Sequence, residues 1–149
     1  MTLPTYVTST TQTKAYRLLR EHVYAVLSEY ELTPTHWSML GIITEARDGV
    51  RHVEISDLLH IKPPLVTAMT KQLLEQGMIR SVQNQFDARA KLLALTPAGK
   101  LFVKNVEAAM NIALSKLLIG LAEQDLITYQ KVLTTIIAND ELLRSNKLK

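Results

Sequence analysis

Two prolines and a glycine fix both ends of one helix in this chain. Pro63 and Pro64 are excluded from a helix interior, because proline lacks an amide hydrogen and its ring crowds the preceding turn, but both fit a first turn. Gly77 is typical of the residue just after a helix, where the backbone turns left-handed. The sequence therefore predicts a helix from Pro63 to Gln76. Helical periodicity gives this helix an inward face, Val66, Met69, Thr70 and Leu73, and an outward row, Pro64, Thr67, Ala68 and Lys71.

The segments on either side of this helix predict a winged helix-turn-helix. A short helix is expected over 54–60, after a possible strand at 51–53, and its end carries His60, a residue type that tolerates left-handed backbone angles. After Gly77, residues 78–83 and 91–95 are expected to pair as a β-hairpin. Short helix, tight turn, second helix and hairpin is the order of a helix-turn-helix followed by its wing.

The loop between the two strands is longer than chain reversal requires. A tight hairpin needs about two loop residues, usually with glycine, whereas residues 84–90 form a seven-residue polar segment that contains Asp87 and Arg89. Arg89 at the tip of such a loop can reach phosphates or the adjacent minor groove. The length of the loop thus indicates a wing that contacts DNA.

The excess positive charge of the chain lies in the same region. Residues 62–91 contain five basic and two acidic residues, and their net charge of +3 equals the formal net charge of the whole chain. A basic block on a helix-turn-helix favours nucleic acid as the partner. The candidate DNA-binding residues are Lys62, Pro63, Pro64, Thr67, Ala68, Lys71, Asp87, Arg89 and Lys91.

The rest of the chain is predicted to be helical, so the expected fold class is mainly α. Helices are expected over 13–30, from Pro34 to about 46 with Thr33 as N-cap, from Pro97 to about 118, and over 123–144. Their apolar residues exceed what one small winged lobe can cover. At 149 residues the chain is expected to form a single domain, and the surplus apolar surface predicts a symmetric homodimer.

Several classes of protein are disfavoured by what the sequence lacks. The chain has no cysteine, and the spacing of its four histidines gives no helical metal pair, so neither a metal nor a cofactor is expected. No phosphate loop, dinucleotide fingerprint or nucleophile elbow occurs, which argues against an enzyme. No apolar run is long enough to span a membrane and the N-terminus has no export pattern, so a cytoplasmic protein without membrane contact is expected.

The order of these motifs carries a family resemblance. The helix-turn-helix pattern of residues 54–79 is followed by Asp87-Ala88-Arg89 and then by Leu95-Thr96 and Gly99. In these features the chain resembles the MarR family of transcriptional regulators, and the likeness covers nearly the whole chain in the order of its elements. The resemblance implies one MarR-like domain over 1–149, with a winged helix DNA-binding lobe at 33–95 and an entwined helical dimerisation region from 1–32 and 96–149.

The resemblance also implies a function. Such proteins are repressors that bind a palindromic operator in double-stranded DNA, and their affinity changes when a small aromatic or phenolic acid binds between the dimerisation and DNA lobes. Arg17, His36 and Trp37 stand on helices expected near that effector site. Asp87 is expected to orient the guanidinium of Arg89 on the wing.

The chain departs from the family at two positions that bear on DNA contact. Ala68 stands where a basic residue is frequent on the recognition helix, and Ser81 stands where arginine is frequent after it. Both changes reduce the expected number of phosphate contacts. Thr67, in contrast, matches a position that meets the major groove.

Alternative interpretations remain open at this level. A winged helix that docks proteins without specific DNA binding is kept open by Leu65 and Leu74, which lie at the edge of the expected core face. Trp37 can be a core residue, Arg17 and His36 can be ordinary surface residues, and Asp87 with Arg89 can be an exposed ion pair of little energetic weight.

Overall fold

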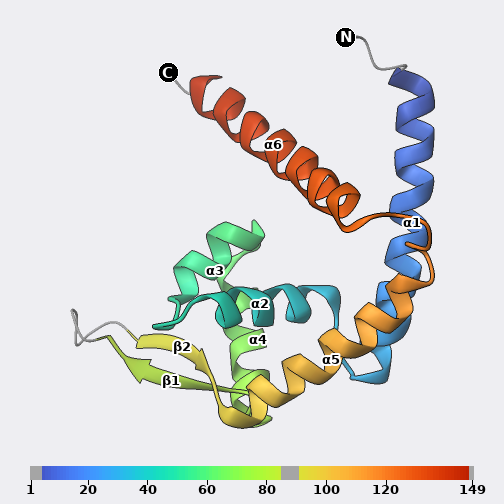
Figure 1. Ribbon diagram of the computed structural model, residues 1–149. Coiled ribbons are helices and arrows are strands. Elements are labelled where there is room, and N and C mark those ends of the chain that lie inside the picture. The colour runs from blue at the N-terminus through green and yellow to red at the C-terminus, as the bar shows by residue number, and fades with distance from the viewer. Residues whose placement is uncertain (1–4, 85–90, 148–149) are drawn as a thin grey trace. The chain divides into compact units, whose positions relative to one another are not determined.

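The computed structural model of the chain describes residues 5–84 and 91–147 (Figure 1). Within these ranges the fold is mainly helical, as predicted. Its elements in chain order are α1 (Thr5–Glu29), α2 (Pro34–Glu45), α3 (His52–Leu59), α4 (Pro63–Glu75), β1 (Ile79–Gln83), β2 (Lys91–Leu95), α5 (Pro97–Ser115) and α6 (Glu123–Lys147). The expected winged helix-turn-helix is thus confirmed as α3, α4 and the β1–β2 hairpin.

The chain forms two compact units, residues 1–114 and residues 115–149. The first contains the helix-turn-helix, the hairpin and the helices α1, α2 and nearly all of α5. The second contains α6, on which most of the apolar side chains are exposed, among them Leu126, Ile127, Tyr129, Val132, Ile136, Ile137, Leu142 and Leu143. In the part of the chain that the structure describes, no helix is both long and apolar enough to cross a membrane.

Threonine caps begin two of the helices, as the Thr-Pro pairs predict. The Thr33 hydroxyl oxygen accepts a hydrogen bond from the His36 amide at 3.2 Å, and Pro34 takes the first helical position of α2. At α5 the Thr96 hydroxyl accepts from the Gly99 amide at 2.9 Å and donates to the Gly77 carbonyl oxygen at 2.6 Å. The second cap therefore also joins the start of α5 to the end of α4.

The start of α3 differs from the sequence-based expectation. Residues 51–53 do not form a strand, because α3 already begins at His52. The carboxylate of Glu54 accepts a hydrogen bond from the Arg51 amide at 2.8 Å, which satisfies an amide at the helix end and allows the earlier start. Instead Val50 forms an isolated antiparallel bridge with Leu93, which places one bridging residue beside β2 just before the helix.

Two hydrophobic clusters lie within the first unit. One fills the winged lobe and consists of buried residues of α2, α3, α4 and the hairpin: Met39, Leu40, Ile43, Val50, Ile55, Val66, Met69, Leu73, Ile79, Leu93 and Leu95. The other joins α1 to α5 through Val26, Leu27, Val106 and Met110. Leu32, Trp37 and Phe102 pack against both clusters, so the winged lobe and the α1–α5 pair share part of their packing.

Candidate nucleic-acid interface

Helix α4 presents the outward row that the sequence predicts. Val66, Met69, Thr70 and Leu73 are buried against the lobe, whereas Pro64, Thr67, Ala68 and Lys71 are exposed. Lys62 is the N-cap residue and Pro63 takes the first helical position, and both are exposed. The exposed row is composed mostly of short side chains, so the backbone of α4 can approach the floor of a major groove closely.

A hydrogen-bonded turn sets the position of α4 relative to α3. His60 ends α3 in the left-handed conformation, with φ of 51°, and its amide bonds back to the Asp57 carbonyl at 3.3 Å. Ser56, which is buried, donates its hydroxyl to the Ile61 carbonyl at 2.7 Å and receives the Ile61 amide on its own carbonyl at 3.2 Å. These bonds hold the chain from the end of α3 to Ile61 and so determine where α4 begins.

Two of the exposed side chains on α4 are already engaged locally. The Thr67 hydroxyl donates to the Pro63 carbonyl at 3.1 Å, which leaves its oxygen as an acceptor and its methyl group free for apolar contact. The ammonium group of Lys71 lies 3.8 Å from a Glu75 carboxylate oxygen, with both side chains more than two-thirds exposed. Such a pair contributes little to stability and can open toward a phosphate.

The hairpin places the wing directly after α4. β1 and β2 are antiparallel, with Ile79 opposite Leu95 and Gln83 opposite Lys91, and Lys91 is exposed at the start of β2. Asp87 and Arg89, the two predicted wing residues, lie outside the described residues. Their role therefore stays a prediction from the sequence.

The predicted ligand residues lie in different surroundings. Arg17 lies in a shallow hollow on α1 that is lined by α1 residues, and its guanidinium is 4.0 Å from the carboxylate of Glu21. His36 is half-buried, with Nδ1 2.7 Å from the Thr33 hydroxyl and with a buried Nε2 for which the described residues provide no partner. Trp37 is half-buried between the two hydrophobic clusters. Its packing matches the alternative interpretation of this tryptophan as a core residue.

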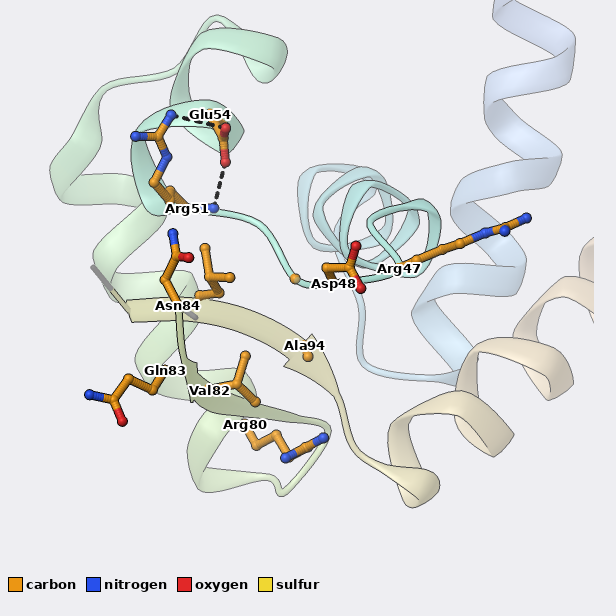
Figure 2. A pocket seen from close by; sticks show the side chains of 11 residues that line it. Arg47, Asp48, Arg51, Glu54, Arg80, Val82, Gln83, Asn84 and Ala94 are labelled. Atoms are coloured by element: carbon orange, nitrogen blue, oxygen red, sulfur yellow. Dashed lines mark hydrogen bonds and ion pairs between the residues drawn. The ribbon is translucent and has the colours of Figure 1, made fainter. Parts of the chain in front are cut away.

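Arg51 and Glu54 form a closed pair at the edge of the lobe. In addition to the bond with the Arg51 amide, the Glu54 carboxylate lies 3.1 Å from the Arg51 guanidinium (Figure 2). These hydrogen bonds hold the pKa of Glu54 below its usual value. This pair was not predicted from the sequence, although an acid three residues after a potential N-cap is a known signal of a capping box.

The comparison with a family model bears on this geometry. Residues 32–91, from the residue before the α2 cap to the first residue of β2, match the model of the MarR family. The chain carries a MarR-family domain. The match supports a DNA-binding transcriptional regulator as the functional class.

Solved structures resemble this chain over most of its length. A transcriptional regulator named PA3341 is 26% identical with a TM-score of 0.73, and the match covers 89% of this chain and 97% of that chain. CouR from Rhodococcus jostii RHA1, solved bound to p-coumaroyl-CoA, is 19% identical with a TM-score of 0.73, over 83% of this chain and 87% of that chain. A mutant MarR from E. coli, solved with operator DNA, is 18% identical with a TM-score of 0.66, over 87% and 92% of the two chains. The last two likenesses establish the common fold.

Proposed function

We propose that this chain is a homodimeric repressor that binds a palindromic operator in double-stranded DNA, with an affinity that a small aromatic or phenolic acid modulates. The observation that carries the proposal is the exposed row of α4, whose short side chains stand on a helix held rigidly by its buried face and by the turn at His60. The solved MarR mutant is bound to operator DNA and CouR to an acyl thioester, which supports a DNA partner and a small-molecule effector.

Exposed apolar surface supports the homodimer. Within the described residues, α1 exposes Tyr16 and Tyr24, α5 exposes Leu101 and Ile112, and α6 exposes the eight side chains named above. Apolar surface on this scale marks an association site. Sedimentation at micromolar concentration should give a dimer of the 16.8-kDa chain, and a purely monomeric species would contradict the proposal.

The exposed row of α4 also predicts the kind of operator. Two recognition helices related by a two-fold axis should contact inverted half-sites about 10 bp apart. Thr67 offers a methyl group, Pro64 only apolar contact and Lys71 a point charge, so none is a bidentate reader of guanine. We expect an A·T-rich site read through thymine methyl groups and groove shape, with each mismatch costing about 1 kcal/mol.

Fluorescence anisotropy with the chain's own upstream DNA tests the proposal. The affinity should fall steeply with salt, because a basic block that contacts phosphates releases counterions. A randomised-site selection that returned a G·C-rich consensus without a palindrome would contradict both the dimer geometry and the reading face.

A protein-docking winged helix is the second candidate, and one observation favours it. Leu65 and Leu74 on α4 are 47% and 41% exposed, which is unusual for large apolar residues on a face expected to meet only DNA. This candidate predicts duplex binding that is weak, independent of sequence and unaffected by the replacement of Thr67.

A further inference from the structure

The wing hairpin has an outer face that turns away from the core. On β1 and β2 the alternate residues Ile79, Leu93 and Leu95 are buried in the lobe, and the residues between them point to the opposite side. A hollow of about 680 Å3 lies on this outer face, between the hairpin and the loop that joins α2 to α3 (Figure 2). Cavities of this volume suit small-molecule ligands.

The strand register arranges the outer face in two rows. Arg80 lies opposite Ala94 and Val82 opposite Leu92 in the hairpin. Because Val50 bridges Leu93 in antiparallel sense, Gly49 continues the first row beside Ala94 and Arg51 continues the second beside Leu92. All six of these residues line the hollow.

Two small residues line the hollow. Ala94 offers only a methyl group beside Arg80, whereas Gly49 packs close to the second row, because a Cβ there would lie 3.4 Å from the Val82 Cγ2. A Cβ at Gly49 would lie 2.9 Å from the Leu92 Cβ and 3.1 Å from the Leu93 carbonyl oxygen, and its φ of 93° also favours glycine. The close approach of this loop to the hairpin therefore depends on Gly49.

The hollow is lined by three arginines, Arg47, Arg51 and Arg80, and by two acids, Asp48 and Glu54, so the lining carries a net charge of +1. The Arg51 guanidinium is balanced by Glu54 at 3.1 Å, and Figure 2 shows Arg47 extending away from the hairpin. No ion pair involves Arg80 in residues 5–84 and 91–147, and its side chain is exposed. Val82 and Leu92, both half-buried, give the second row an apolar floor next to this cation.

We propose that this hollow binds a small organic acid with a flat apolar body, such as an aryl carboxylate. The body lies on Val82 and Leu92, and the carboxylate meets the Arg80 guanidinium, which is suited to bidentate hydrogen bonding with a carboxylate. The inference rests on the proposed function, because it gives the effector of that function a site at the base of the wing rather than between the lobes.

A ligand at this position acts on the wing directly. β1 leads out of α4 and both strands lead into the wing loop, so the ligand contacts the segment that positions the wing against DNA. If an acid weakens operator binding tenfold, operator DNA must weaken the binding of that acid tenfold as well, since the coupling is reciprocal.

Amide NMR spectra of the full-length protein, titrated with benzoate, 4-hydroxybenzoate and 4-hydroxycinnamate, test the inference. At least one acid should shift amides of residues 49–51, 80–84 and 91–94 in a saturable way. Arg80→Gln removes the cation and Ala94→Leu fills the first row, and each should weaken binding at least tenfold. Lys104→Gln and Ala98→Leu, which make matched changes at exposed positions of α5, should leave binding unchanged, and the spectra themselves report whether each variant is folded.

Other outcomes overturn the inference in distinguishable ways. Shifts centred on His36 and Trp37 instead of the hairpin would place the effector elsewhere, and no binding of any of the three acids by a protein that binds its operator would remove the site but leave the proposed function intact. If Arg80→Gln lowered operator affinity and its salt dependence without affecting acid binding, Arg80 would be a DNA contact. Acid binding in the hollow by a folded dimer that binds no operator would support the site and refute the repressor.

Discussion

The junction between α4 and α5 makes a strong prediction about Gly99. A Cβ built at this buried glycine would lie 1.9 Å from the Met78 carbonyl oxygen, far inside any normal contact. That oxygen cannot move freely, because it accepts a hydrogen bond from the Thr96 amide at 3.0 Å and lies 3.2 Å from the Thr96 hydroxyl, whose proton it shares with the Gly77 carbonyl oxygen at 2.6 Å. Gly99→Ala must therefore displace the start of α5 or break these bonds.

The expected cost follows from these contacts. Loss of the hydrogen bond from the Thr96 amide costs roughly 1 kcal/mol, and overpacking of a tight site costs about 1–3 kcal/mol. We expect Gly99→Ala to lower the free energy of unfolding by about 2–4 kcal/mol, a large part of the roughly 5–15 kcal/mol that holds a typical domain. Urea unfolding, followed by the fluorescence of Trp37, the single tryptophan of the chain, measures this loss.

Gly41 supplies the matched control. It lies inside α2, and a Cβ there would meet no atom within 4 Å. Gly41→Ala should thus stabilise the protein by about 0.5–1 kcal/mol through helix propensity alone. Both variants must be compared at one protein concentration, since dimerisation shifts apparent stability. The reasoning would be refuted if Gly99→Ala cost less than about 1 kcal/mol, or if both substitutions had the same sign.

Three further predictions concern single side chains. Thr70→Val should raise the free energy of unfolding by about 1 kcal/mol, because the Thr70 hydroxyl is buried without a partner among the described residues. Thermal unfolding measures the change, with Thr67→Val at an exposed position as the control. A loss of stability in Thr70→Val would contradict the conclusion that this hydroxyl lacks a partner. Glu54→Gln should cost at most about 0.5 kcal/mol at pH 7, since the pair with Arg51 is partly exposed. The pKa of Glu54 is lowered on folding, so this stability is present above the unfolded-state pKa and is lost as the pH falls through the folded-state pKa. A stability difference between the two proteins that persisted at pH 2 would show that the charge of Glu54 is not its cause. Arg89→Ala should lower the salt dependence of DNA binding by about one unit per subunit, whereas Lys104→Ala should not, and an unchanged slope for Arg89→Ala would return Arg89 to an ordinary surface role.

Local chemistry made much of the DNA-binding lobe predictable from the sequence. The Thr-Pro pairs at 33–34 and 96–97, the two prolines of α4 and Gly77 act within one helical turn, so their effects do not depend on distant residues. The same is true of His60, whose left-handed angles end α3 as expected. α3 begins two residues earlier than predicted because the Glu54 side chain accepts the hydrogen bond of the Arg51 amide, which a strand would need for its own pairing. The apolar pattern alone does not decide between helix and strand at these residues.

The hollow on the wing could not be predicted in the same way, because it depends on register between segments far apart in the sequence. Alternation within β1 places Arg80 and Val82 on one face, but nothing local indicates that Ala94 lies opposite Arg80 or that Gly49 completes the row through the bridge of Val50 with Leu93. The same register brings Thr96 and Gly99 next to the end of α4, because β2 returns the chain to that point. There the Thr96 hydroxyl donates to the Gly77 carbonyl oxygen, and Gly99 lies against the Met78 carbonyl group. Because α4 and the hairpin are joined by hydrogen bonds at this junction, a ligand bound to the outer face of the hairpin and DNA bound to α4 contact two parts of one hydrogen-bonded unit.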